Sequence, residues 1–132
     1  MDLTHVIDAA REASFRAYAP YSNFRVGAAI LTEDGAVYTG CNVENASLGL
    51  TTCAERNAAA AMALAATDAH DRKVQLVAVV SPNAPLCFPC GACRQVLYEF
   101  GCEEVVVIEE SGIPHRYTLD TLLPHTFGLE SL

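Results

Sequence analysis

The chain has 132 residues, of which 52% are hydrophobic and 18% are charged. This composition excludes an intrinsically disordered protein and favours a single domain that spans residues 1–132. The formal net charge is −8, because 16 acidic residues outnumber 8 Lys and Arg. A surface of this sign repels a phosphate backbone, so we expect no nucleic-acid partner and favour a neutral small-molecule substrate.

The N-terminal residues and the apolar segments indicate the cellular compartment of the protein. Residues 1–5 lack the basic region and the long apolar stretch of a signal peptide. The longest apolar run, at residues 58–66, is too short to cross a bilayer. We therefore expect a soluble, cytoplasmic protein with no membrane partner. In that compartment cysteines serve as metal ligands or free thiols before disulfides, and the chain has Cys41, Cys53, Cys87, Cys90, Cys93 and Cys102.

The first third of the chain predicts a helix followed by a β-hairpin. Apolar residues recur at helical spacing within residues 3–17, and Asp2 can cap the start of this helix. Pro20 disfavours helix in the residue before it and ends the element. Short apolar runs at residues 26–31 and 36–39 flank a Glu-Asp-Gly turn, which is typical of two paired strands.

The rest of the chain alternates helices with strands. This alternation predicts an α/β protein with a layered sheet and helices packed on its faces. The alanine content of the second helix favours helix strongly, and Gly101 ends the third. In chain order we expect a loop at 41–52, a helix at 53–66, a strand at 74–80, a loop at 82–89, a helix at 90–100, strands at 105–108 and 116–119, and a short helix at 120–123.

Two cysteine motifs stand where the second and third helices begin. They are Cys53-Ala54-Glu55 and Pro89-Cys90-Gly91-Ala92-Cys93. Cys90 and Cys93 share one face of a helix because they are three positions apart. The positive end of each helix dipole favours thiolate over thiol. If both helices point at one place, three thiolates meet there and predict a zinc site.

The residues beside these cysteines indicate chemistry. Three protein ligands leave one zinc position open for water, and Glu55 beside it can move protons. Three thiolates exceed the charge of Zn²⁺ by one, and two helix N-termini offset this by ~0.5 charge each. Arg56 can offset more by donating hydrogen bonds to the thiolates. Thr52 is the expected N-cap of the alanine-rich helix, which places Glu55 at the N3 position of a capping box.

Two other interpretations of the cysteines stay open at this point. The spacing of Cys87, Cys90 and Cys93 is also found in iron–sulfur proteins, but the position where their fourth cysteine is expected holds Leu97. A closed structural zinc site needs a fourth ligand, which Cys41, Cys87, Cys102 or a distant histidine can supply. We favour the open site, with the remaining cysteines as small buried thiols. Glu55 can also be a capping residue only.

Further motifs carry a resemblance to a known family. They are Ala19-Pro20-Tyr21-Ser22-x-Phe24-x-Val26-Gly27-Ala28-Ala29, Cys41-Asn42-Val43-Glu44-Asn45-Ala46-Ser47, Cys53-Ala54-Glu55-Arg56, Pro89-Cys90-Gly91-Ala92-Cys93-Arg94-Gln95-Val96, and Leu122-Leu123-Pro124 with Phe127 close behind. With these motifs in this order, the chain resembles the cytidine deaminases of the short, homotetrameric type over nearly its whole length. The resemblance implies a three-layer α/β/α fold with a mixed sheet of about five strands and helices on both faces.

The resemblance also implies a reaction and a set of residue roles. The reaction is the zinc-dependent hydrolysis of cytidine and 2′-deoxycytidine to uridine and 2′-deoxyuridine with release of ammonia, in pyrimidine salvage. The resemblance implies that Cys53, Cys90 and Cys93 bind zinc and that Glu55 transfers protons. It implies that Phe24 packs on the pyrimidine, that the backbone N–H of Ala54 contacts the pyrimidine carbonyl, and that Asn42 and Glu44 contact the ribose 3′-hydroxyl. It also implies that Phe127 enters the active site of a neighbouring subunit.

One position departs from the pattern, and two rivals need to be distinguished. The family commonly has tyrosine where this chain has Leu48, which puts a tyrosine contact with the 5′-hydroxyl in doubt. The rival enzyme is a blasticidin S deaminase, which shares the zinc motifs. Deaminases that act on tRNA or nucleotides usually carry histidine in place of Cys53. The rival from another class is a non-catalytic zinc or iron–sulfur module.

Overall fold

A five-stranded sheet organises the protein, for which the computed structural model describes residues 2–68 and 71–132. The strand order is β2-β1-β3-β4-β5. Strands β3 and β4 pair in parallel, and the other neighbours pair antiparallel. In chain order the elements are α1 (Thr4–Ser14), β1 (Gly27–Thr32), β2 (Val37–Cys41), η1 (Leu48–Leu50), α2 (Ala54–Ala65), β3 (Val74–Val80), α3 (Gly91–Glu99), β4 (Glu104–Ile108), β5 (Pro114–Thr118), α4 (Leu119–Leu122) and η2 (Leu129–Ser131).

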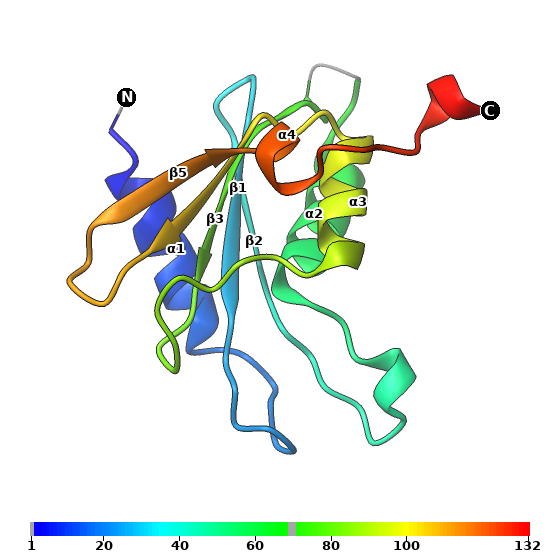
Figure 1. Ribbon diagram of the computed structural model, residues 1–132. Coiled ribbons are helices and arrows are strands. Elements are labelled where there is room, and N and C mark those ends of the chain that lie inside the picture. The colour runs from blue at the N-terminus through cyan, green and yellow to red at the C-terminus, as the bar shows by residue number, and fades with distance from the viewer. Residues whose placement is uncertain (1, 69–70) are drawn as a thin grey trace.

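Helices cover both faces of the sheet (Figure 1). On one face α1 buries Val6 and Ala10 against alternate residues of the strands, such as Leu76. On the other face α2 and α3 bury Met62 and Leu97 against the opposite set. The predicted three-layer α/β/α architecture with a mixed sheet is therefore confirmed. Within the described residues, none of the helices has the length and apolar character that a membrane span requires.

The central strands of the sheet coincide with the apolar runs that the sequence predicted as strands. Strands β1, β3 and β4 are buried along almost their whole length because helices pack on both of their faces. Such strands have continuous apolar sequences, which is how they could be recognised. Strand β5 lies at an edge and alternates exposed with half-buried residues, so its pattern is weaker. It covers Pro114–Thr118 and begins before the predicted position 116.

The strand directions bring the starts of two helices together. Strand β1 is antiparallel to both β2 and β3, so β2 and β3 run in the same direction. Helix α2 follows β2 and α3 follows β3. Because both helices pack on the same face and run back along the sheet, both of their N-termini lie near the carboxyl ends of the strands that precede them.

A glycine in β2 lets α2 approach this edge closely. A Cβ atom built on Gly40 would lie 2.5 Å from the Ala54 carbonyl oxygen and 2.4 Å from the Ala58 amide nitrogen. Both contacts are with backbone, so no side-chain rotation could relieve them. Only glycine therefore fits under the first turn of α2, and this turn carries the predicted catalytic motif.

The predicted capping box of α2 is wrong. The N-cap is Cys53, with extended backbone, and its side chain makes no capping hydrogen bond. Thr52 is held outside the helix because it exchanges backbone hydrogen bonds of 2.9 and 3.0 Å with Val43. Glu55 therefore stands at N2 rather than N3, so its carboxylate has no capping role of the predicted kind. Likewise Cys90 is the N-cap of α3, which begins at Gly91.

Other boundaries differ by a few residues. Helix α1 ends at Ser14, before the predicted limit, and Asp2 accepts a hydrogen bond of 2.9 Å from the Thr4 amide although the N-cap position is Leu3. The predicted loop at 41–52 contains the short helix η1. The last short helix, α4, begins and ends one residue before the predicted 120–123. These shifts leave the order of the elements unchanged.

Candidate metal centre and surrounding site

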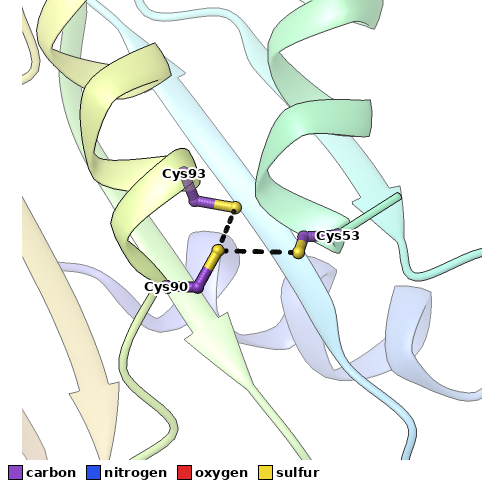
Figure 2. A group of neighbouring side chains, drawn as sticks. All are labelled: Cys53, Cys90 and Cys93. Atoms are coloured by element: carbon purple, nitrogen blue, oxygen red, sulfur yellow. Dashed lines mark hydrogen bonds between the residues drawn. The ribbon is translucent and has the colours of Figure 1, made fainter. Parts of the chain in front are cut away.

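Three cysteine side chains meet at the starts of α2 and α3 (Figure 2). The Cys53 and Cys90 sulfurs are 3.8 Å apart, and those of Cys90 and Cys93 are 3.5 Å apart. All three sulfurs lie within 4.8 Å of one another. Cys93 is buried, Cys53 is half-buried and Cys90 is exposed. The structure thus brings together the three residues that the sequence predicted as ligands.

The spacing of the sulfurs fits a tetrahedral zinc ion. A Zn–S bond of about 2.3 Å and a tetrahedral angle place two sulfurs about 3.8 Å apart. The measured sulfur separations of 3.5 and 3.8 Å are close to this value. No other His, Cys, Asp or Glu among the described residues joins the group. A set of three thiol ligands is typical of a zinc site with one position left for water or substrate.

The other three cysteines lie outside this group. Cys102 is buried, and its thiol donates to the Glu104 carbonyl at 3.4 Å. Cys41 donates to the Arg16 carbonyl at 3.6 Å. Burial raises the pKa of Cys102 to about 12 and that of Cys87 to about 11, which keeps both as neutral thiols. Within the part of the chain that is described, the geometry therefore favours neither a closed four-ligand zinc site nor an iron–sulfur cluster.

The cluster holds negative charge even before a metal binds. A hydrogen bond from the Cys93 thiol, and to a lesser extent one from Arg56, lowers the pKa of Cys53 to about 5. The pKa of Cys93 is raised, first by its hydrogen bond to Cys53 and then by burial. Cys53 is thus a thiolate at neutral pH and Cys93 its proton donor. A divalent cation would displace that proton, as metal binding to thiols generally does.

Glu55 lies in the first turn of α2 and is almost inaccessible to solvent. Only 4% of its surface is exposed. Burial raises the pKa of its carboxyl group to about 7, and the negative charge on Cys53 raises it further. A carboxyl group that titrates near neutral pH can both accept and donate a proton under working conditions. Its burial and its closeness in sequence to Cys53 are compatible with the predicted proton transfer, and that role stays a prediction.

Arg56 contacts the cluster as the sequence predicted. Its Nη2 atom lies 3.6 Å from the Cys53 sulfur. The Nε atom of the same side chain is buried and has no hydrogen-bond partner among the described residues. A guanidinium cation here offsets part of the negative charge of the thiolates. The predicted contact is present, and its effect on chemistry stays a prediction.

The sequence model of the family described as "Cytidine and deoxycytidylate deaminase zinc-binding region" matches residues 2–109. The chain belongs to the cytidine and deoxycytidylate deaminase family. The resemblance seen in its motifs is therefore confirmed at the level of the family, whose members are zinc-dependent hydrolases.

Individual relatives match along nearly the whole chain. A cytidine deaminase of Sporosarcina psychrophila is 41% identical over 134 residues, which cover 100% of this chain and 96% of the relative. One of Mycobacterium tuberculosis is 47% identical over 123 residues, covering 93% and 87%. The crystal structure of a cytidine deaminase from Burkholderia pseudomallei superposes with a TM-score of 0.82 at 46% identity, covering 96% of this chain and 100% of that one.

In this member of the deaminase family, two predicted sugar contacts hold the segment that carries Phe24. The Asn42 amide accepts from the Val26 N–H at 2.8 Å and donates to the Phe24 carbonyl at 2.7 Å. Glu44 accepts from the Tyr21 and Ser22 amides at 2.9 and 3.1 Å and from the Ser22 hydroxyl. Both side chains thus position this turn, which is the structural alternative to the sugar contacts that polar residues in such a segment allow.

Ser22 is a further residue that was not predicted for this site. Its hydroxyl donates to Glu44 and accepts from the Phe24 amide at 2.9 Å. It therefore links a predicted sugar contact to a predicted base contact. The available signal was a serine two residues before an aromatic residue in a turn, since serine hydroxyls bond to nearby backbone in such segments.

The remaining predicted residues lie at different depths. Ala54 is fully buried at the first position of α2, where a backbone N–H has no partner within the helix. The Phe24 side chain is 39% exposed and that of Phe127 is 60% exposed. Phe127 belongs to the C-terminal segment, which extends outward from the body of the subunit (Figure 1). A contact of Phe127 with a neighbouring subunit is compatible with this exposure.

Substitution of Arg56 by alanine should weaken activity and shift its pH dependence. Without the guanidinium, the negative charge of the thiolates is less compensated, and a zinc ion held by them would acidify water less strongly, so that hydroxide would be available only at higher pH. We expect a lower kcat, and an acid limb of the pH–rate profile that moves to higher pH. Measurement of kcat between pH 5 and 9 checks this. A profile identical to that of the wild type would contradict the role of Arg56.

Substitution of Glu55 by glutamine should remove one source of pH-dependent stability from the metal-free protein. The carboxyl pKa is about 7 in the folded state against 4.5 when exposed. Between these values the folded state binds more protons, so the wild type loses stability as the pH rises. We expect the variant to gain stability relative to the wild type across this window, by on the order of 3 kcal/mol at pH 7.

Urea unfolding of both proteins in a chelator, from pH 4 to pH 7.5, measures this difference. Titration of the thiols contributes to both proteins and largely cancels when the two curves are subtracted. A difference that does not change with pH would show that Glu55 has an ordinary pKa.

Proposed function

We propose that this protein catalyses the zinc-dependent hydrolytic deamination of cytidine and 2′-deoxycytidine, releasing ammonia and forming uridine and 2′-deoxyuridine for pyrimidine salvage. The observation that carries the proposal is the buried Glu55 on the first turn of α2, two residues after Cys53, which is one of the three clustered thiols. The names of the relatives from Sporosarcina psychrophila and Mycobacterium tuberculosis give the substrate class.

The proposed site would bind zinc through Cys53, Cys90 and Cys93. Bound zinc acidifies water, which makes hydroxide available near neutral pH. Glu55 accepts a proton as water attacks C4 of the cytosine ring, and it delivers this proton to ring N3. Glu55 then moves the proton of the new hydroxyl group to the amine, the C4–N bond breaks, and ammonia leaves. Burial of Glu55 supports this sequence because a pKa near 7 suits both directions of transfer.

The substrate would be held by groups that have spare hydrogen-bonding capacity. A carboxylate can accept about four hydrogen bonds and Glu44 accepts three, which leaves about one lone pair for a sugar hydroxyl. The Asn42 amide likewise retains one donor and one acceptor position. We propose that both contact the ribose 3′-hydroxyl, that the Ala54 N–H contacts the pyrimidine carbonyl, and that Phe24 packs on the ring. A 3′-hydroxyl is present in both ribo- and deoxyribonucleosides.

We further propose a homotetramer in the cytoplasm in which Phe127 of one subunit completes the site of another. Many large apolar side chains are exposed on the single subunit, which is typical of a surface covered by further copies. They include Phe15, Tyr21, Leu48, Leu50, Phe127 and Leu129. The rival hypothesis of a blasticidin S deaminase is disfavoured because the stretch Asn42-Val43-Glu44-Asn45-Ala46 resembles that of the nucleoside enzymes.

Substitution of Glu55 by alanine should abolish turnover while zinc remains bound. The variant keeps all three thiols and loses the only group assigned to proton transfer, so we expect kcat to fall by at least ~10³-fold. Ammonia release from cytidine, with zinc content measured on the same samples, checks this. Near-normal turnover in a zinc-loaded variant would refute the assignment. A zinc-loaded wild type that releases ammonia from blasticidin S but not from cytidine would favour the rival enzyme.

A mixing experiment tests whether Phe127 acts between subunits. Glu55→Ala and Phe127→Ala subunits, each impaired alone, are denatured together and refolded as mixed oligomers. In a mixed oligomer some sites combine an intact Glu55 from one subunit with an intact Phe127 from another. We expect activity to rise above that of either variant refolded alone. If Phe127 serves its own subunit, mixing leaves the activity at the average of the two variants.

A further inference from the structure

Arg94 makes two hydrogen bonds that join separate parts of the chain. Its Nε atom donates to the Pro89 carbonyl at 2.8 Å, and its Nη1 atom donates to the Leu122 carbonyl at 2.8 Å. Arg94 follows Cys93 directly on α3 and is half-buried. A planar guanidinium that donates two short hydrogen bonds to backbone oxygens is held in one orientation. A lysine ammonium group, on a flexible stem, would not be fixed in this way.

The first of these bonds acts on the backbone next to Cys90. Pro89 precedes Cys90 directly, and the peptide unit between them is planar, so a bond to the Pro89 carbonyl fixes the plane that also contains the Cys90 nitrogen. Pro89 is buried, so its carbonyl needs a partner. Cys90 itself is exposed, whereas Cys93 is fully buried in the core. Of the two thiols on α3, Cys90 is therefore the one that packing holds least.

The second bond connects this turn to the edge of the sheet. Leu122 is the last residue of α4. The first residue of α4, Leu119, is buried, and its amide donates to the Glu103 carbonyl at 3.0 Å, directly before β4. Helix α4 also continues from β5 without a loop. Arg94 thus ties the exposed end of the cysteine motif to an element that is anchored on two strands.

We propose that Arg94 is a positioning residue for the metal site, which holds Cys90 in its ligating position by tying Pro89 to α4. This inference rests on the proposed zinc site, but not on the proposed reaction. It predicts that loss of Arg94 affects how long the metal is retained, because groups that orient ligands typically change metal affinity by about 10- to 100-fold. A tie that merely supports the C-terminal segment would leave metal retention unchanged.

Arg72 offers a matched control elsewhere in the molecule. It is also half-buried, and its Nη2 atom donates to two backbone carbonyls, those of Ala63 at 3.5 Å and Ala66 at 3.2 Å. These carbonyls are at the C-terminal end of α2, whereas the cysteines are at the N-termini of α2 and α3. Arg72→Gln therefore removes a comparable backbone tie without touching the backbone of a ligand.

The experiment follows the transfer of zinc from the loaded protein to an excess of a chromophoric chelator, 4-(2-pyridylazo)resorcinol. We expect Arg94→Gln to release zinc at least about tenfold faster than the wild type. Arg94→Lys should be intermediate, since an ammonium group lacks the fork that reaches both carbonyls. Arg72→Gln should release zinc at the wild-type rate. Thermal unfolding of all the proteins reports the general loss of stability.

The outcomes separate the possibilities. Wild-type zinc release from Arg94→Gln, or equally fast release from Arg72→Gln, overturns the proposal. If Arg94→Gln does not fold, Arg94→Lys decides, since accelerated release supports the role and an unchanged rate overturns it. A wild-type protein that retains zinc without deaminating cytidine refutes the proposed reaction and leaves this test valid. A wild-type protein that binds no zinc refutes both.

Discussion

Two helices that begin at the same edge of the sheet are the constraint on which the site depends. Their common origin follows from β1, which lies antiparallel to the strands that lead into both helices. Each helix presents a cysteine at its N-cap, and α3 presents a second one three positions later. The sulfur cluster is therefore a property of the topology, and Cys53 and Cys90, 37 positions apart in the sequence, meet at the starts of these two helices.

Neighbouring residues at the start of α2 have pKa values that are shifted in opposite directions. Cys53 and Arg56 are three positions apart and lie on the same side of the helix, where the Arg56 Nη2 atom is 3.6 Å from the Cys53 sulfur. Glu55, one position before Arg56, is turned by about 100° from it and is buried. The thiol of Cys53 loses its proton readily, while burial makes the carboxyl group of Glu55 keep its proton to higher pH. Arg56 stabilises the thiolate from outside the cluster. The start of α2 thereby carries the proposed ligand, the proposed proton carrier and a counter-charge.

Much of this could be predicted from the sequence, for identifiable reasons. The central strands are buried on both faces and have continuous apolar runs, and the three clustered cysteines and Glu55 lie within short motifs whose spacing matches a helix start. The cap of α2 could not be predicted, because Thr52 is removed from the helix by a backbone bridge to Val43, which is distant in sequence. The same holds for Asn42 and Glu44, whose partners at residues 21–26 are brought near only by the folded chain.

The three thiols of the cluster differ in their exposure to solvent, so the cluster is open to water on one side only. Cys90 faces solvent, Cys53 is half covered and Cys93 has no accessible surface. A thiol-alkylating reagent that diffuses in from water therefore meets Cys90 first and Cys93 last. In metal-free protein Cys90 is thus the most accessible of the three thiols, and one adduct there would disrupt the proposed set of three ligands.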